Sequence, residues 1–260
     1  MKNIKILIAT HKKYKVPEND LYLPLQVGAN GKESIGFSRD DTGDNISSKN
    51  PYYCELTGLY WAWKNLDVDY IGLCHYRRYF KGKLKFEING KTKHILSRQE
   101  VEKMLEKNDI ILPKKRHYYI ETIYSHYKDT MYVEPLDEVG KIIKENYEEY
   151  YKQYEMLKIR RSAHILNMFI MKKEIFDKYC EWLFDILFKL ENRIDPKQYD
   201  SFHARYLGRI SERLLDIWIN TNKYAYKEIK LESIEKQNII KKVVGVLNAK
   251  FRKKKYEQSF

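Results

Sequence analysis

A cluster of polar side chains follows an apolar run in the segment DYIGLCHYRRYFKG, residues 69–82. Residues 71–74 are apolar and predict a buried strand. The residues that follow this strand directly are His75, Tyr76, Arg77 and Arg78. Two adjacent guanidinium groups offer planar, permanently charged forks that suit a diphosphate. The alternatives are ion pairs with Asp67 or Asp69, or plain solvation; we favour an anion-binding site.

A second apolar run, KILIAT at residues 5–10, also ends in polar side chains. These side chains belong to Thr10, His11 and Lys12. In an open α/β sheet, ligands bind outside the carboxyl ends of the strands. We therefore expect these residues to line the same ligand as the cluster that follows residue 74.

The segment DDTGDNISSKNP, residues 40–51, gathers acidic and amide side chains around one glycine. Asp44 and Asn45 are candidates for binding a base or a ribose. The alternatives are a metal site, or capping of the next helix, because Asn50 and Pro51 are favoured at an N-cap and a first helical position. The spacing is not that of a calcium loop, which needs a glutamate at its twelfth position.

Two further segments carry residues that could do chemistry. His164 and Asn167 come just before a predicted buried strand, and the alternative for both is a turn that satisfies its own backbone. Glu212 is placed at the start of a helix with an apolar opposite face, which makes it a candidate proton acceptor. The helix dipole alone also favours a glutamate in a first turn.

The elements that must position these residues follow from hydrophobic periodicity. The pattern predicts a hairpin at residues 86–96 around Asn-Gly and a long functional loop at 16–49. It also predicts strands over residues 5–10, 69–74, 109–115 and 224–231, and helices over 51–65, 98–108, 136–158, 174–192 and 211–220. Strands that alternate with helices argue for one α/β domain.

Composition narrows the class of protein. The chain has 260 residues, and no run of eighteen apolar residues that would span a membrane. Its amino-terminal segment does not resemble a signal peptide, and its three cysteines have no metal-type spacing. An odd cysteine count then predicts reduced thiols in the cytoplasm. Motifs typical of dehydrogenases, P-loop NTPases, zinc enzymes and α/β-hydrolases are absent.

Much of the net charge of +13 lies near the carboxyl terminus, since residues 236–255 contain eight basic and no acidic residues. Apolar residues interleave with these lysines, as in a basic amphipathic helix that binds an anionic membrane surface. We predict a domain over residues 1–232, a tail over 233–260, and peripheral attachment to the inner face of the cell membrane. The alternatives are a solvated terminal helix and RNA binding, although no nucleic-acid recognition motif is present.

Several sequence blocks together resemble a known family. The blocks are KILIATHK, TGDNISSKNPYYCELTGLYWAWKN, DYIGLCHYRRYF, ILPKK, HILNMFIMKKEIFDKYCEWLF and ERLLDIW. They are similar to short bacterial glycosyltransferases encoded in capsular, exopolysaccharide and O-antigen clusters, whose domain was long catalogued as of unknown function. Some members are described as galactofuranosyltransferases. The resemblance covers roughly residues 4–220, and GDNIS and HYRRY are its most specific parts.

This resemblance implies a GT-A-like fold with a central, mostly parallel sheet flanked by helices. It implies transfer of a hexosyl group from a UDP-sugar to a lipid-linked oligosaccharide; the alternative is a non-catalytic nucleotide- or glycan-binding module. It also suggests the role of each candidate residue. Catalysis would fall to His75, Arg77, Arg78 and Glu212; donor binding to Thr10, His11, Lys12, Asp44, Asn45 and Tyr76; acceptor binding to His164 and Asn167.

The family resemblance raises one question about metals. GT-A enzymes usually carry a metal-binding Asp-x-Asp at the strand end that corresponds to Cys74, and His75-Tyr76-Arg77 stands there instead. We therefore assign no metal ligand and expect cationic side chains to neutralise the leaving diphosphate. His75 remains an alternative ligand for manganese or magnesium.

Overall fold

The computed structural model describes residues 2–235 and 255–256. The chain divides into two compact units. Unit 1 comprises residues 1–114, 165–182 and 224–235, and unit 2 comprises residues 115–164, 183–223 and 236–260. Nearly all of the predicted basic tail lies outside the described residues, so the predicted boundary at residue 232 stays a prediction.

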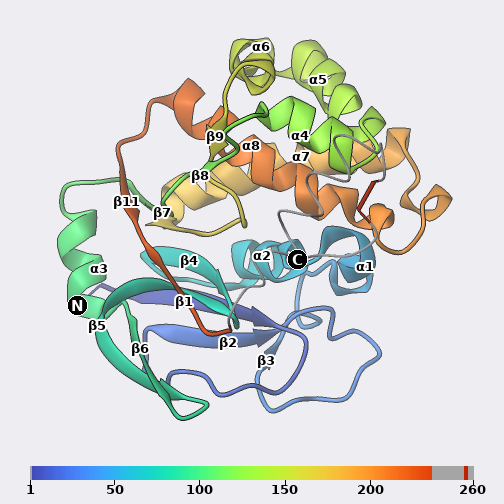
Figure 1. The fold of residues 1–260 in the computed structure, drawn as a ribbon. Coiled ribbons are helices and arrows are strands. Elements are labelled where there is room, and N and C mark those ends of the chain that lie inside the picture. The colour runs from blue at the N-terminus through green and yellow to red at the C-terminus, as the bar shows by residue number, and fades with distance from the viewer. Residues whose placement is uncertain (1, 236–254, 257–260) are drawn as a thin grey trace. The chain divides into compact units, whose positions relative to one another are not determined.

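Unit 1 is built on a ten-stranded mixed sheet (Figure 1). Along its main path the order is β11-β7-β10-β4-β1-β2-β3, with β5, β6 and β12 attached through β4 and β5. Strand β1 pairs in parallel with β2 and β4, whereas β10 runs antiparallel to β4 and β7. The strands are β1 (Ile4–Thr10), β2 (Tyr22–Gln26), β3 (Ser38–Arg39), β4 (Tyr70–His75), β5 (Arg78–Ile88), β6 (Lys91–Ile95), β7 (Ile110–Pro113), β10 (Phe169–Lys172), β11 (Tyr226–Ile229) and β12 (Leu231–Ser233). The predicted α/β class with a mostly parallel central sheet is confirmed.

Helices cover both faces of this sheet, which explains why β1 and β4 are apolar almost throughout. On one face, Ile6, Ile8 and Ile170 belong to a core that also contains α3 residues Val101 and Leu105. On the other face, the ring of Phe169 contacts α7. The helical elements of unit 1 are η1 (Ser47–Lys49), α1 (Asn50–Tyr53), α2 (Leu56–Asn65), α3 (Arg98–Leu105) and the first half of α7 (Lys173–Arg193).

Unit 2 is mainly helical. A two-stranded ladder, β8 (Arg116–His117) with β9 (Ser162–Ala163), accompanies the helices. Gly140 in α5 leaves room for the ring of Tyr154 in α6, whose phenol donates to the Leu136 carbonyl. The helices are α4 (Ile123–Thr130), α5 (Glu134–Asn146), α6 (Glu148–Glu155), the second half of α7 and α8 (Tyr206–Asn222), with short η2 (Met156–Lys158), η3 (Pro196–Gln198) and η4 (His203–Arg205). Among the described helices, none is both long and apolar enough to cross a bilayer.

Several local predictions are confirmed. The hairpin turns at Asn89 and Gly90, both with positive φ. Ser97 and Glu100 form the expected capping box at the start of α3.

Other local predictions are wrong. The helix predicted over 51–65 is broken at Cys54, whose φ is 55°. Asn50 is the first residue of α1 and not its N-cap. The segment 136–158 forms two α-helices that meet at Tyr147. Glu212 lies in the middle of α8, because this helix already begins at Tyr206.

Candidate active site

The topology of unit 1 brings several chain segments to one edge of the sheet. The parallel strands β1, β2 and β4 all end there. Strand β10 begins at the same edge, because it is antiparallel to β4 and pairs Phe169 with Leu73. Residues that follow three strands and residues that precede a fourth are therefore gathered beside the end of β4, which is the usual ligand-binding edge of an open α/β sheet.

The ring of Tyr76 is the centre of a cluster after β4, which we call the Tyr76 cluster. Tyr76 is only 6% exposed. His11 and Tyr14 make edge-to-face contacts with it, with ring centroids 5.5 and 5.0 Å away. Lys12 Nζ and Arg77 Cζ lie 5.4 and 5.2 Å from its centroid, within cation–π range. The structure thus groups three predicted site residues, His11, Lys12 and Arg77, around the ring of a fourth, Tyr76, and Tyr14 joins them without having been predicted.

Thr10 shapes the loop that carries two of these side chains. Its hydroxyl is buried and donates to the Lys12 carbonyl at 2.7 Å. The Thr10 carbonyl in turn accepts from the backbone N–H of Val27, the first residue after β2. Thr10 therefore supports the loop of His11 and Lys12, with its own hydroxyl bonded within that loop.

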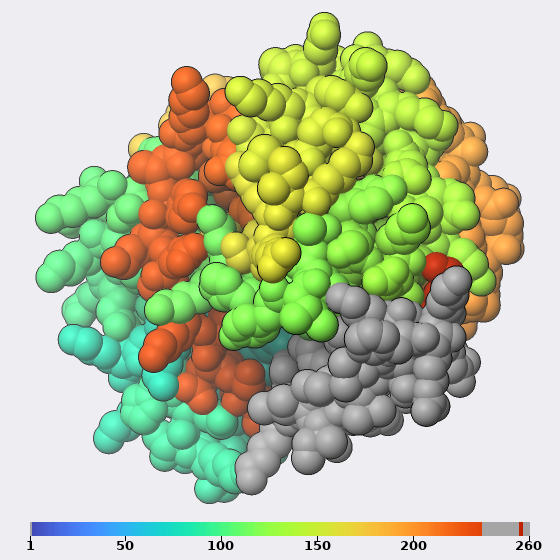
Figure 2. Space-filling model, turned by 45° about the horizontal axis from the view of Figure 1, so that its top comes forward, coloured from blue at the N-terminus to red at the C-terminus, as the bar shows by residue number. Residues whose placement is uncertain are grey.

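The carboxyl-terminal stretch of unit 1 places an acid beside this cluster. Glu235 Oε2 lies 3.6 Å from an Arg77 nitrogen, and Tyr14 donates to Glu235 Oε1 at 3.4 Å. Burial and the neighbouring Glu235 raise the pKa of Tyr14. Residues 226–235, orange-red in Figure 2, lie beside the blue-green β5–β6 hairpin, where β12 pairs with β5. Both side chains of the Arg77–Glu235 pair are nearly half exposed, so this pair contributes little to stability.

Arg78 begins β5 and pairs with His75 and with Ser233 in the ladder. His75 Nε2 donates to the Leu166 carbonyl oxygen at 2.7 Å. The next residue, Asn167, is 2% exposed and donates its amide to Glu55 Oε1 at 2.8 Å. This chain of contacts joins the end of β4 to the start of β10 and to the turn between α1 and α2.

The loop over residues 40–51 is held in place by Asp40, which sequence reasoning did not single out. Asp40 is fully buried and accepts four hydrogen bonds. By contrast, Asp44 is exposed and accepts from the Tyr60 hydroxyl at 3.3 Å. The Asn45 side chain bonds to the Gly43 carbonyl and the Ser47 N–H, as in an Asx turn. Donor binding by Asp44 and Asn45 stays a prediction.

The remaining predicted residues belong to unit 2. His164 is 1% exposed, and its Nδ1 lies 2.5 Å from Asp216 Oδ1 while its backbone N–H donates to Oδ2. Glu212 pairs with Arg213 at 2.7 Å. Their predicted acceptor and catalytic roles stay predictions, and each side chain already has an internal partner.

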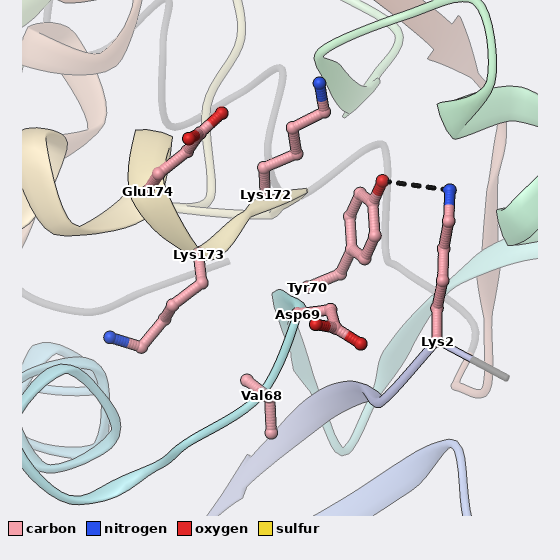
Figure 3. A pocket seen from close by; sticks show the side chains of 7 residues that line it. All are labelled: Lys2, Val68, Asp69, Tyr70, Lys172, Lys173 and Glu174. Atoms are coloured by element: carbon pink, nitrogen blue, oxygen red, sulfur yellow. Dashed lines mark hydrogen bonds between the residues drawn. The ribbon is translucent and has the colours of Figure 1, made fainter.

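A pocket at the opposite edge of the sheet contains three lysines but offers little free positive charge (Figure 3). Lys2 donates to the Tyr70 hydroxyl at 3.1 Å, and Lys173, which points away from the other lysines, pairs with Asp177. Lys172 lies 4.0 Å from Asp109. Since Asp69 and Glu174 also line this pocket, its charge is mixed. Within residues 2–235 and 255–256, no group of three or more histidine, cysteine or acidic side chains is placed to hold a metal.

Sequence reasoning missed three acidic residues near the candidate site. These are Asp40, Glu55 and Glu235. Asp40 stood inside a segment already identified as polar, so it could have been included. Glu55 and Glu235 carried no local signal, because their partners lie 112 and 158 to 221 positions away.

Comparison with known proteins identifies the domain. A family model described as a domain of unknown function, DUF4422, matches residues 5–223. The structure is similar to the apo structure of the bifunctional glycosyltransferase WbbM, with a TM-score of 0.77 and 34% sequence identity. This similarity covers 88% of the present chain but only 45% of the WbbM chain. No curated protein sequence matches the chain.

Proposed function

The chain belongs to the DUF4422 family, and from this premise we propose that it is a glycosyltransferase of cell-surface polysaccharide synthesis. The observation that carries the proposal is the 34% identity to a glycosyltransferase over 88% of this chain. The Tyr76 cluster supports it, because lysine, arginine and imidazole groups at a strand end suit a nucleoside diphosphate.

The substrates follow from the same premise. We take the donor to be a UDP-hexose, with galactofuranose as the first sugar to test, and the acceptor to be a lipid-linked oligosaccharide. The side chains of His11 and Lys12 would face the nucleotide and its phosphates, with Thr10 supporting their loop and the ring of Tyr76 holding both side chains in place. Asn167 would lie on the acceptor side of the end of β4.

The chemistry required of these residues is mainly electrostatic. As the bond between the anomeric carbon and the diphosphate breaks, negative charge grows on the leaving phosphate. Preorganised cationic groups stabilise such charge, and the loss of one typically slows the reaction by a hundredfold or more. Arg77 and Lys12, whose cationic groups lie 5.2 and 5.4 Å from the centroid of the Tyr76 ring, would take this role, and Arg78 follows directly in the chain.

The proposal is tested with a panel of UDP-, dTDP- and GDP-sugars incubated with the full chain and a bacterial membrane extract. We expect release of nucleoside diphosphate from one donor and incorporation of its labelled sugar into the lipid fraction. Each reaction is run with Mn²⁺, with Mg²⁺ and with EDTA. Nucleotide binding without sugar transfer across the panel would instead support a non-catalytic binding module and contradict the proposal.

Membrane attachment is proposed for the basic carboxyl-terminal segment, of which only residues 255–256 are among the described residues. Deleting residues 236–260 should weaken sedimentation with vesicles that contain anionic lipid, because attraction is about 1 kcal/mol per basic residue near such a surface. Hydrolysis of a soluble donor should persist in the shortened chain. Undiminished vesicle binding after the deletion would contradict this role, and neutral vesicles are the control.

A further inference from the structure

The turn between α1 and α2 holds one glutamate in a strained but well-supported position. Cys54, just before Glu55, has φ 55° and ψ −133°. Such a conformation costs a non-glycine residue about 1–3 kcal/mol and persists only where surrounding contacts enforce it. Here the Cys54 carbonyl accepts from the side-chain amide of Asn50 at 2.7 Å, and the Cys54 N–H donates to the Asn50 carbonyl at 2.9 Å. The position of Glu55 is therefore fixed by its neighbours.

The partner of Glu55 lies on a second strained turn. Leu166 and Asn167 have φ values of 82° and 52°, although neither is a glycine. His75 fixes this turn through its hydrogen bond to the Leu166 carbonyl. Two strained turns, far apart in the sequence, thus meet at the hydrogen bond between Asn167 and Glu55. Strain of this kind is concentrated at functional sites.

The carboxylate of Glu55 is bonded differently from that of Asp40. Asp40 accepts four hydrogen bonds. In the described part of the chain, Glu55 has a neutral amide on Oε1, and neither an ion pair nor a hydrogen bond on Oε2. The side chain is also half-buried and not enclosed. One carboxylate oxygen is therefore oriented by the protein while the other can accept a proton.

We propose that Glu55 is the proton acceptor for the acceptor hydroxyl, with Asn167 as its positioning residue; this inference rests on the proposed function. The hydroxyl oxygen forms a bond to the anomeric carbon as the bond from that carbon to the diphosphate oxygen breaks. The bonding electron pair leaves with the nucleoside diphosphate, and the hydroxyl proton passes to Glu55 Oε2. Attack from the face opposite the leaving group inverts the anomeric configuration.

The location of Glu55 is consistent with this division of roles. Strand β4 lies between β1, which is followed by His11 and Lys12, and β10, which is preceded by Asn167. The cationic groups for the leaving diphosphate are thus on the β1 side of the end of β4. The Asn167–Glu55 pair is on the β10 side. The leaving diphosphate and the attacking hydroxyl would therefore meet residues on opposite sides of the end of β4.

The test compares Glu55→Gln with Glu102→Gln, a matched change of a half-buried glutamate on α3. For Glu55→Gln we expect unchanged UDP binding by calorimetry and a fall in kcat of at least about a hundredfold, as for loss of a general base. The acidic limb of the kcat–pH profile of the native enzyme should be absent from that of Glu55→Gln, because this variant has no carboxylate to accept the hydroxyl proton. Glu102→Gln should behave as the native chain does.

Three further measurements keep the inference falsifiable. NMR of the product should show an anomeric configuration opposite to that of the donor. Glu55→Asp should recover part of the kcat that Glu55→Gln loses. Asn167→Ala should lower kcat, but kcat of this variant should still fall at low pH. Turnover of Glu55→Gln within threefold of native, or a retained configuration, would overturn the inference and leave the proposed function intact. A native chain that binds UDP but transfers no sugar would overturn both.

Discussion

The end of β2 and the end of β4 lie on the same edge of one sheet, but the carboxylates near them differ in burial and in the number of hydrogen bonds that they accept. Beyond β2, the Asp40 carboxylate accepts from the N–H groups of Gly28 and Ala29 and from the hydroxyls of Ser47 and Thr57 at 2.5 to 2.9 Å. Beside the end of β4, Glu55 and Glu235 are partly exposed, and each has one or two partners: Glu55 the neutral amide of Asn167, and Glu235 the exposed Arg77 and the hydroxyl of Tyr14. We call these the closed region and the open region.

The difference indicates how to separate structural polar groups from functional ones in this molecule. A buried carboxylate with every lone pair bonded stabilises the fold, because removing it leaves several donors unsatisfied. A carboxylate or guanidinium that keeps bonding capacity at the same edge can exchange its partner for a ligand. Residue type alone does not distinguish the two, since both regions use aspartate or glutamate.

The largest effect is expected in the closed region. Asp40→Ala should lower the free energy of unfolding by about 3 kcal/mol, because four donors lose their buried acceptor. Urea unfolding followed by tryptophan fluorescence measures it. Asp67→Ala, at an exposed position of the same unit, is the control and should stay within about 0.5 kcal/mol. A native-like midpoint for Asp40→Ala would remove the basis of the comparison.

The next largest effect is expected on the rate of sugar transfer, from a substitution in the open region. Arg77→Ala should lower kcat/KM for sugar transfer by at least about a hundredfold, equivalent to about 2.7 kcal/mol of transition-state stabilisation. Its stability should change little, since the Arg77–Glu235 pair is exposed. Arg98→Ala is the matched control, because Arg98 bonds to Lys2 and Asp20 at the opposite edge. Native turnover in a folded Arg77→Ala variant would exclude this arginine from the mechanism.

A smaller effect is expected at Glu100, which is half exposed yet well bonded. Burial opposes ionisation of Glu100, but the backbone N–H groups of Lys83 and Ser97 outweigh it and hold its pKa below the usual 4.5. A lowered pKa stabilises the fold above the unfolded-state value and loses that contribution as pH falls through the folded-state value. Glu100→Gln should therefore cost about 1 kcal/mol at pH 7.

This difference between native and Glu100→Gln should begin to shrink as the pH falls to the reference pKa of a glutamate, about 4.3, and should vanish only below the lower pKa of Glu100 in the folded state; thermal unfolding across pH checks it. If the difference in stability between the two proteins did not change with pH, hydrogen bonds to the ionised form of Glu100 would not be its cause. Glu100 accepts several hydrogen bonds, as Asp40 does in the closed region, but it is partly exposed, as the carboxylates of the open region are. The result therefore shows whether hydrogen bonds stabilise the fold without full burial of the carboxylate.

The smallest effect is expected at Glu235, whose carboxylate contacts Arg77 and would compete with the proposed diphosphate for this arginine. Glu235→Gln should strengthen UDP binding about two- to fivefold, the range of an exposed ion pair. Calorimetry at low salt measures this change. Glu232→Gln, which removes pairs to Lys93 and Lys81, is the control. Weaker UDP binding in Glu235→Gln would mean that Glu235 orients Arg77 for the ligand.

Much of the fold could be predicted because its signals are local. The apolar runs of β1 and β4, the Asn-Gly hairpin and the capping box all depend on residues within a few positions of one another. Strand β2 was missed because Pro24 interrupts a five-residue strand, and proline argues against a strand interior. The break at Cys54 was missed because apolar residues keep helical spacing across it.

The site was predictable only where it follows strand ends. Residues 10–12 and 75–77 could be grouped because parallel strands end at one edge. His164 and Asn167 are three positions apart, yet His164 belongs to unit 2 and is bonded to Asp216, whereas Asn167 belongs to unit 1. Glu55 could not be found from sequence alone, because its partner lies 112 positions away.

One reversed strand has a consequence for how this scaffold can diversify. In a wholly parallel sheet, only segments that leave strands reach the ligand edge, so a single set of loops carries every specificity. Because β10 enters the sheet at that edge, Asn167 is anchored by the core strand that it precedes. The loops after β1 and β2 can therefore change in sequence without displacing Asn167, because its position depends on β10 and on the neighbours of that strand.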